Sequence, residues 1–371
     1  MKLKFCVPCL FGLEGLCADE LKRLNFEDVK TENGRVTFSG GIRDIAKANI
    51  NLRTGERVLL TIGETNANSF DELFEGVRAM PWEQYIPVDG EFPVKGHSLG
   101  SKLHSIPDCQ KIVKKAVVER LREKYKTELL PETAEKYQIQ FAIMNDIAVL
   151  YIDTSGAGLH KRGYRPVGSS APLRETLAAA IVKLSRYRGR EAVYDPFCGS
   201  GTIPIEAALA AINRAPGLNR SFAAEDWTWA DKSIWAEAKA EAVSKEFQGE
   251  YKIWGGDIDS KCIEISKENA RRAGVSEYIN FEISDATTFY RETENRTGII
   301  LTNPPYGERV MQQNEAEELY RIFGEATRKL DNWKMYILSS HTEFERTFGK
   351  TAVKKRKLYN GMIKCDLFMY F

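Results

Sequence analysis

The last two hundred residues of this 371-residue chain alternate between apolar β-type segments and amphipathic helical segments, and this alternation constrains the fold most. Parallel strands need long crossover connections, usually helices, so the rhythm predicts a doubly wound, mostly parallel α/β sheet. A helix carrying the stripe Leu173, Leu177, Ile181 and Leu184 precedes the first strand. Strands are expected at 192–194, 252–255, 279–283, 298–302 and 334–338, with helices at 203–212 and 262–273. The segments 354–358 and 362–370 predict an antiparallel edge hairpin around Asn360-Gly361.

The part of the chain before this alternation predicts two small α/β units. Residues 1–65 form the first unit and residues 66–155 the second, whose last two strands meet at the turn Asn145-Asp146. Gly156-Ala157-Gly158 interrupts the pattern. We therefore expect a basic linker at 156–170, followed by the larger α/β domain at 171–371.

Composition narrows the protein class. Hydrophobic residues make up 43% of the chain and charged residues 28%, which is ordinary for a globular protein. No apolar stretch reaches the roughly 18 residues of a membrane helix, and Glu14 comes too early for a secretory signal. The seven cysteines are dispersed, and Cys6 and Cys9 fit packed thiols on a first strand. We expect a cytoplasmic protein without a metal site.

Positive charge is concentrated although the net charge is only +1. The segment 95–126 has nine basic and three acidic residues, and the segment 160–190 has eight basic and one acidic. Such segments suit a polyanion-binding surface, but charge runs also simply solvate a helix face. Charge alone leaves both interpretations open.

The string Asp195-Pro-Phe-Cys-Gly199-Ser-Gly201 follows a predicted strand and opens a helix. In a doubly wound sheet this loop lies at the ligand crevice, and its glycines let a ligand approach the backbone. A P-loop would need Gly-Lys-Ser/Thr, and a dinucleotide site would have glycine where Pro204 stands. A carboxylate at Asp195 instead suits a cationic ligand such as S-adenosylmethionine (AdoMet). An ordinary glycine-rich turn remains the alternative.

Two later strand ends carry carboxylates that suit a nucleoside. Asp257 could accept hydrogen bonds from ribose hydroxyls, with Ile258 against the adenine, and Asp285 could accept from the adenine amino group. Aspartates are also common turn formers at strand ends. The interval from the glycine loop to Asp257 is unusually long and contains a Trp-rich insertion around residues 227–235.

The string Thr302-Asn303-Pro304-Pro305-Tyr306-Gly307 ends the fourth strand and is the most informative in the chain. The lone pair of an aromatic amine is delocalised into its ring. Two acceptors, the Asn303 side-chain carbonyl and the Pro304 backbone carbonyl, could bind both N–H groups and free that lone pair. Two prolines stiffen the loop, and Tyr306 could stack on a flat base. Catalysis would then be mostly positioning and electrostatics.

Together the Asp-Pro-Phe-Cys-Gly-Ser-Gly and Asn-Pro-Pro-Tyr-Gly strings resemble class I AdoMet-dependent amino-methyltransferases. From Leu159-His-Lys-Arg-Gly-Tyr-Arg through Leu173-Arg-Glu-Thr-Leu-Ala-Ala-Ala to the last hairpin, the chain is similar to THUMP-containing RNA guanine-N2 methyltransferases, above all bacterial large-subunit rRNA enzymes. Some relatives carry an N6-adenine DNA methylase label because they share Asn-Pro-Pro-Tyr. The resemblance implies a ferredoxin-like first unit, a THUMP second unit and one Rossmann-like methyltransferase domain.

The resemblance also implies roles for individual residues. Asn303, Pro304 and Tyr306 would be catalytic. The cofactor AdoMet would be held by Thr176, Asp195, Pro196, Phe197, Gly199, Gly201, Thr202, Asp257, Ile258, Asp285 and Ala286, with Thr176 at the methionine carboxylate. Structured RNA would be the partner, bound through Lys102, Lys111, Lys114, Lys115, Lys161, Arg162 and Arg165.

The activity expected from this resemblance is methyl transfer to the N2 amine of a guanine in 23S rRNA. A tRNA guanine-N2 methyltransferase has the same domain order, and the Asn-Pro-Pro-Tyr string does not exclude adenine N6, cytosine N4 or a glutamine amide. An RNA-binding protein with an inactive methyltransferase fold is a different class. The intact Asp195, Gly199, Gly201 and Asn303 speak against that class.

Overall fold

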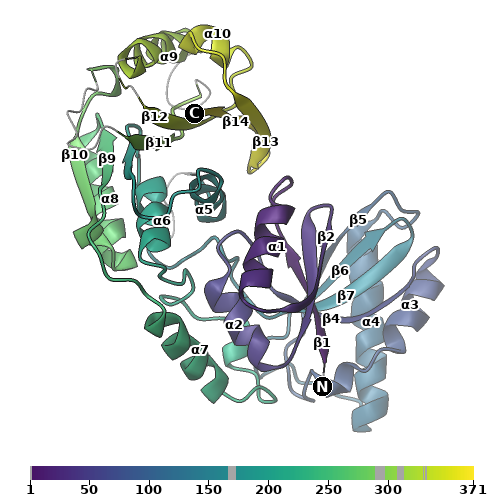
Figure 1. Ribbon diagram of the computed structural model, residues 1–371. Helices are drawn as coiled ribbons and strands as arrows, with labels where there is room; N and C mark the ends of the chain where they lie inside the picture. The colour runs from purple at the N-terminus through teal and green to yellow at the C-terminus, as the bar shows by residue number, and fades with distance from the viewer. Residues whose placement is uncertain (1, 166–172, 289–296, 307–312, 329, 331) are drawn as a thin grey trace.

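The computed structural model describes residues 2–165, 173–288, 297–306, 313–328, 330 and 332–371. Figure 1 shows an N-terminal half, in purple and blue, and a C-terminal half, in teal to yellow. Each half is built on a seven-stranded sheet. The α/β fold class predicted from the sequence is confirmed.

The first sheet has the strand order β2-β3-β1-β4-β7-β6-β5. Its strands are β1 (Leu3–Pro8), β2 (Glu27–Glu32), β3 (Arg35–Gly40), β4 (Leu59–Asn66), β5 (Val94–Leu99), β6 (Ile139–Met144) and β7 (Ile147–Asp153). Strand β4 pairs with β1 on one side and with β7 on the other. The sheet is therefore continuous across the boundary that the sequence predicts at residues 65 and 66.

The helices of this half are α1 (Glu14–Arg23), α2 (Arg43–Asn51), α3 (Phe70–Arg78) and α4 (Ile106–Tyr125), with a 3₁₀ turn η1 (Trp82–Gln84). The Ser69 hydroxyl caps α3 by accepting from the Glu72 backbone N–H. Asn145 and Asp146 both have positive φ, as a tight β6–β7 hairpin turn requires. Cys6 and Cys9 are buried free thiols, and burial raises the pKa of Cys6 to about 12.

The second sheet has the order β10-β9-β8-β11-β12-β14-β13. Its strands are β8 (Ala192–Asp195), β9 (Ile253–Asp257), β10 (Ile279–Ile283), β11 (Gly298–Thr302), β12 (Trp333–Ser339), β13 (Lys354–Asn360) and β14 (Ile363–Tyr370). The first five are parallel to one another, and β14 pairs antiparallel with both β12 and β13. The strand order reverses at β8, which places a ligand crevice at the carboxyl ends of the strands beside it.

The second sheet is accompanied by α5 (Glu175–Leu184), α6 (Thr202–Ala211), α7 (Ser233–Ser244), α8 (Ser260–Ala273), α9 (Gln313–Thr327) and α10 (Phe344–Phe348), and by 3₁₀ turns η2 (Ala223–Glu225), η3 (Ser276–Tyr278) and η4 (Ala286–Thr288). Helix α5 begins at Glu175, after the described segment resumes at 173. No helix among the described residues is long and apolar enough to cross a membrane.

The Trp-rich insertion joins the two halves. The indole N–H of Trp227 donates to the Lys136 backbone carbonyl (3.0 Å), and its ring stacks on Tyr137 with centroids 5.1 Å apart. Helix α7 packs against α2, as Figure 1 shows, and Gly217 donates its backbone N–H to the Ile50 carbonyl. The buried residues of this insertion belong to the core of the N-terminal half. The long segment between the glycine loop and Asp257 thus connects the C-terminal half to the N-terminal half.

Candidate active site

Four polar side chains come together at the carboxyl ends of the parallel strands. Asp195 ends β8, Asp257 ends β9, Asp285 follows β10 by two residues, and Asn303 follows β11 directly. The four strands are neighbours in the order β10-β9-β8-β11 and point the same way. These side chains therefore share one edge of the sheet, as the sequence predicts.

Asp195 is buried and is oriented from the adjacent strand. Its Oδ1 accepts from the Thr302 hydroxyl (2.6 Å) and from the Phe197 backbone N–H (3.1 Å). Burial raises the pKa of Asp195 to about 7, and the nearby Asp257 acts in the same direction. A cation placed against this carboxyl group would stabilise its charged form. The site thus fits the ammonium group of a ligand such as AdoMet.

The two glycines of the loop have different surroundings. Gly199 has φ +52°, and a Cβ built there would meet no described atom within 4 Å. Gly201 has φ +80°, and its Cβ would lie 3.0 Å from both Phe281 and Ser266. Open space therefore adjoins Gly199, where a ligand can approach the backbone, whereas Gly201 allows α6 to pack closely against its neighbours.

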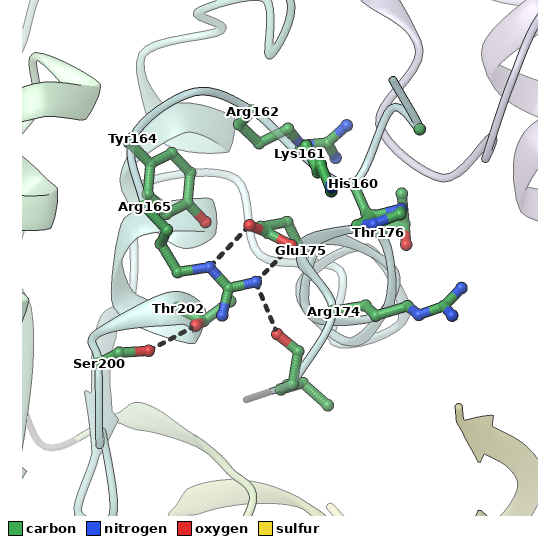
Figure 2. A network of polar contacts seen from close by, with 12 residues as sticks. His160, Lys161, Arg162, Tyr164, Arg165, Arg174, Glu175, Thr176, Ser200 and Thr202 are labelled. Carbon is green, nitrogen blue, oxygen red and sulfur yellow. Dashed lines mark hydrogen bonds and ion pairs between the residues drawn. The ribbon is translucent and has the colours of Figure 1, made fainter. Parts of the chain in front are cut away.

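The other residues expected in this loop are mostly turned inward. Pro196 and Thr202 are buried, and Thr202 lies at the start of α6 with its hydroxyl 3.2 Å from that of Ser200 (Figure 2). The half-buried Phe197 ring packs edge-to-face on Phe323, with centroids 5.1 Å apart. The Phe197 backbone N–H, rather than its ring, is directed at Asp195.

Asp257 connects the glycine loop to the next strand. Its Oδ2 accepts from the Gly199 backbone N–H (2.9 Å), and its Oδ1 accepts from the Asp259 backbone N–H (3.0 Å). Each carboxylate oxygen keeps a further lone pair for a hydroxyl group. Ile258, directly after it, is 73% exposed and is available to a flat ring.

Asp285 is exposed and lies just before η4. Its Oδ1 accepts both from the Thr287 backbone N–H (2.8 Å) and from the Thr287 hydroxyl (2.7 Å). Ala286 is buried at the start of η4. These bonds orient the Asp285 carboxylate at the carboxyl edge of the sheet, where Oδ2 can accept from a ligand.

Asn303 is half-buried and Pro304 is buried. The Tyr306 hydroxyl donates to Asn303 Oδ1, and the Cys365 thiol lies 3.7 Å from that hydroxyl. Burial raises the pKa of Tyr306 well above its usual range. The Tyr306 ring packs against the hydrophobic cluster that contains Cys365. This differs from the expected stacking platform: here Tyr306 orients Asn303. Gly307 lies outside the described residues.

Thr176 contacts the N-terminal half. Its hydroxyl donates to Glu56 Oε1 (2.5 Å), and the same carboxylate is paired with His160 and Arg174 at 3.2 Å each. Burial alone would raise the pKa of Glu56, but the hydrogen bonds from His160 and Thr176 outweigh it and lower that pKa. Sequence reasoning missed Glu56, because a glutamate in a loop 120 residues before its partner carries no local signal.

Four of the seven basic residues expected to bind RNA are exposed: Lys102, Lys111, Lys115 and Lys161. Lys114 is half-buried. Its ammonium group is 2.6 Å from the Glu132 carboxylate and 3.4 Å from the centroid of the Phe92 ring. Lys114 thus holds α4 to the loop before β6.

The structure corrects the expectation for Arg162 and Arg165. Arg162 is only 3% exposed, and its guanidinium donates to Glu206 (3.3 Å) and to the Leu159 carbonyl (2.7 Å). Arg165 pairs with Glu175 at 2.6 Å, beside the start of α6 (Figure 2). Because both guanidinium groups are committed to buried carboxylates, they are connections within the protein and not RNA contacts.

Models of known families match three successive parts of the chain. Residues 4–59 match an RlmL ferredoxin-like domain, residues 67–153 match a THUMP domain, and residues 162–368 match an RMKL-like methyltransferase domain. The last match covers the whole crevice described above.

Relatives of known name agree with these matches. The chain is 43% identical to "Putative RNA methyltransferase YpsC" of Bacillus subtilis (strain 168), over 97% of this chain and 94% of that protein. It is 35% identical to the ribosomal RNA large subunit methyltransferase K/L of Psychromonas ingrahamii, over 99% of this chain and 50% of that protein. The chain therefore spans about half the length of the K/L relatives.

Solved structures extend the likeness to the whole fold. A protein of Listeria monocytogenes described as "a predicted N6-adenine-specific DNA methylase" is 45% identical, with a TM-score of 0.94, over 100% of this chain and 96% of that one. The methyltransferase-like protein SMU.472, solved with S-adenosylhomocysteine, is 39% identical, with a TM-score of 0.93, over 100% and 98%. AdoMet is accordingly the cofactor, and the chain belongs to the THUMP-containing, RMKL-like family of RNA methyltransferases.

Proposed function

We propose that this protein transfers a methyl group from AdoMet to the exocyclic N2 amine of a guanine in large-subunit ribosomal RNA. One observation carries the proposal: the hydrogen bond from Thr302 to Asp195. This bond joins Asp195 at the end of β8, which suits a cationic cofactor, to Thr302 at the end of β11, which directly precedes Asn303. Donor and acceptor of the methyl group would thus be held by two neighbouring strands.

The residues around the glycine loop would bind the cofactor. Asp195 would face the ammonium group, and the open space at Gly199 would admit the methionine portion beside the backbone. Asp257 would accept from the ribose hydroxyls, and Ile258, Asp285 and Ala286 would surround the adenine. When bound, AdoMet supplies an electrophilic methyl group on a sulfonium.

The loop after β11 would bind the target amine. The Asn303 side-chain carbonyl and the Pro304 backbone carbonyl would accept its two N–H groups, which turns the nitrogen lone pair out of conjugation. A carbonyl oxygen has two lone pairs, so Asn303 can keep its bond from Tyr306 while accepting one from the base. Holding the donor and the acceptor in line supplies most of the rate enhancement. The methylated nitrogen then loses a proton without a strong base.

Several observations favour RNA as the substrate. Residues 67–153 match a THUMP domain, and Lys111 and Lys115 extend from the same exposed face of α4, with side chains 79% and 67% exposed. The K/L relatives are named as large-subunit rRNA methyltransferases. Guanine N2 as the acceptor rests on the family resemblance. A base in a duplex would have to leave its stack to reach Asn303.

The test is methyl transfer from labelled AdoMet to total RNA from a strain that lacks this gene. The RNA is separated by size and digested to nucleosides, with Asn303→Ala protein as the matched control. We expect label as N2-methylguanosine in 23S rRNA with the wild-type protein only. Label in tRNA would keep the chemistry and change the substrate. Label as N6-methyladenosine would overturn the choice of base.

A further inference from the structure

The C-terminal hairpin lies beside the catalytic loop and projects beyond it. We propose that the tip of the β13–β14 hairpin contacts the RNA next to the target nucleotide, and that Met362 enters the base stack when that nucleotide turns into the active site. This inference rests on the proposed RNA substrate. It assigns the hairpin a role in opening the stack, in addition to its pairing with the sheet.

The register of the sheet fixes where the tip lies. Ser339, the last residue of β12, pairs with Asp366 of β14. Strand β14 runs antiparallel to β12, so the residues before Asp366 extend past the carboxyl ends of the parallel strands. At about 3.3 Å per residue, Met362 lies about 13 Å beyond that edge. This is the edge at which Asn303 follows β11.

The strands directly behind the tip are in contact with the catalytic loop. Cys365 lies 3.7 Å from the Tyr306 hydroxyl, and the Asn360 side chain also interacts with that hydroxyl. Tyr306 in turn donates to Asn303. The hairpin therefore supports the side chain that would bind the target amine, and a base seated at Asn303 lies close to the tip.

Met362 is unusual for an apolar residue because it is 98% exposed. It follows the turn at Gly361, which has φ +66° and no described atom within 4 Å of where a Cβ would stand. The tip thus stands free of the protein. Apolar side chains, methionine among them, are inserted between bases by proteins that unstack nucleic acids, and methionine is flexible and polarisable. An apolar side chain at a free tip suits this use.

The charge of the hairpin identifies the partner as a polyanion. Residues 354–370, which form the hairpin, contain five lysines and arginines and one acidic residue, Asp366, which lies opposite Lys357. Lys357, Tyr359 and Lys364 are exposed, and Tyr359 pairs directly opposite Lys364 across the two strands. Lysines bind phosphates, and an exposed aromatic ring beside them can stack on bases. RNA satisfies both features, whereas an acidic protein surface would use only the charge.

The hairpin also reaches the N-terminal half. The Arg356 guanidinium donates to the Gly12 backbone carbonyl, and Figure 1 shows β13 directed towards α1. RNA held by the N-terminal half can therefore reach the catalytic loop along the hairpin. The same arrangement keeps the hairpin at a fixed position relative to that half.

The first experiment compares Met362→Ala with wild-type protein on two forms of one RNA. The probes are folded large-subunit rRNA from a strain lacking the gene, and the same rRNA cut into short single strands. We expect kcat/KM to fall about tenfold on folded RNA and less than about twofold on single strands, with AdoMet affinity unchanged. Val353→Ala, at an exposed position outside the tip, is the control and should match wild type on both. Equal rates for Met362→Ala and wild type on folded RNA would overturn the proposed insertion of Met362 into the base stack.

The second experiment tests the charge. A Lys357→Glu, Lys364→Glu double variant should bind folded rRNA about tenfold more weakly, with a smaller dependence of affinity on salt. Lys267→Glu on α8 is a control with one charge reversal instead of two, and it should bind like wild type. Equal binding by the double variant would overturn the hairpin as an RNA contact. Wild-type protein that binds RNA but methylates none would instead overturn the proposed function. The comparison of RNA affinities would still show whether the hairpin contacts RNA.

Discussion

Glu56 and Thr176 are joined by a 2.5 Å hydrogen bond that links the N-terminal half to the first turn of α5. Thr176 is the residue expected near the methionine carboxylate, and Glu56 also binds His160 and Arg174. A residue of the N-terminal half thus orients the helix that carries Thr176. We therefore expect the N-terminal half to shape the cofactor site through α5.

Replacing Glu56 should weaken both stability and cofactor binding. In Glu56→Ala, three donors lose their acceptor, so we expect the free energy of unfolding to fall by about 1–3 kcal/mol. AdoMet affinity should fall several-fold because α5 loses its orientation. Urea unfolding and calorimetric titration measure the two effects. Glu64→Ala, on an exposed part of β4, is the control. Unchanged AdoMet affinity in a folded Glu56→Ala protein would separate this network from the cofactor site.

AdoMet affinity should depend on the ionisation of Asp195. The pKa of this buried carboxyl is about 7, so its charged form, which would attract the ammonium group, is lost as the pH falls below that value. We expect affinity to rise with pH from 5.5 and to level off above about 7, approaching tenfold per pH unit at the acidic end. The α-amino group of AdoMet stays mostly protonated below its pKa of about 7.7–8.0, so the ligand contributes little to this slope.

The control for this pH dependence is Asp195→Asn. This variant should bind AdoMet weakly at pH 7.5, with little change across the same range. Calorimetry in two buffers of different ionisation enthalpy would also detect the proton released on binding at pH 6. The same pH slope in Asp195→Asn as in wild type would assign the ionisation to another group.

The two glycines of the loop should respond differently to alanine. In Gly201→Ala the new Cβ would lie 3.0 Å from Phe281 and Ser266, and the positive φ is unfavourable for alanine. The free energy of unfolding should therefore fall by at least about 2 kcal/mol. Gly199→Ala has room for its Cβ and should cost about 1–2 kcal/mol from φ alone. Its new methyl group would enter the space proposed for the cofactor. AdoMet affinity should therefore fall in folded Gly199→Ala, and equal affinity would remove the cofactor from that space.

Asn303→Ala should abolish most turnover without changing AdoMet affinity. Asn303 would contact only the target amine, and loss of one such oriented acceptor lowers kcat by about 10²–10³-fold. Single-turnover methyl transfer and calorimetry measure the two quantities. Tyr306→Phe keeps the ring and removes the hydroxyl that orients Asn303, so it should lower kcat less. Full turnover by Asn303→Ala would exclude Asn303 from the mechanism.

The parallel arrangement of the C-terminal sheet could be predicted because β8, β11 and β12 are mostly buried and apolar and the strands alternate with helical segments. The edge strand β2 was not predicted, since its sequence Glu-Asp-Val-Lys-Thr-Glu is almost wholly exposed and has no apolar alternation. Helix α7 was also missed. Its buried apolar residues pack into the core of the N-terminal half, so no neighbouring segment of the sequence indicates that they form a buried helix face. The helices α9 and α10 were not predicted either.

The candidate site shows the same division. Asp195, Asp257, Asp285 and Asn303 could be found because strand ends in a parallel sheet converge. The partners of the site residues could not be predicted, because they act across strands or domains. Thr302 binds Asp195 from the adjacent strand, Cys365 lies against Tyr306, and Glu56 binds Thr176 from the N-terminal half. Arg162 and Arg165 were misassigned for a related reason. A basic string in the sequence does not reveal whether its guanidinium groups pair with a buried carboxylate such as that of Glu206. In the sequence, Ser170 could cap the helix before the first strand, with Pro172 in its first turn, but both residues lie outside the described residues.

Arg162 and Lys115 should therefore give opposite results when replaced. Arg162→Ala leaves the buried Glu206 without its guanidinium, so the free energy of unfolding should fall by about 3–5 kcal/mol. Lys115→Ala removes an exposed charge and should leave stability within about 0.5 kcal/mol. Conversely, Lys115→Ala should weaken RNA binding and reduce its salt dependence, whereas Arg162→Ala that remains folded at low temperature should bind RNA like wild type. Urea unfolding and filter binding at several salt concentrations measure both. A stable Arg162→Ala protein with weakened RNA binding would restore Arg162 to the RNA surface.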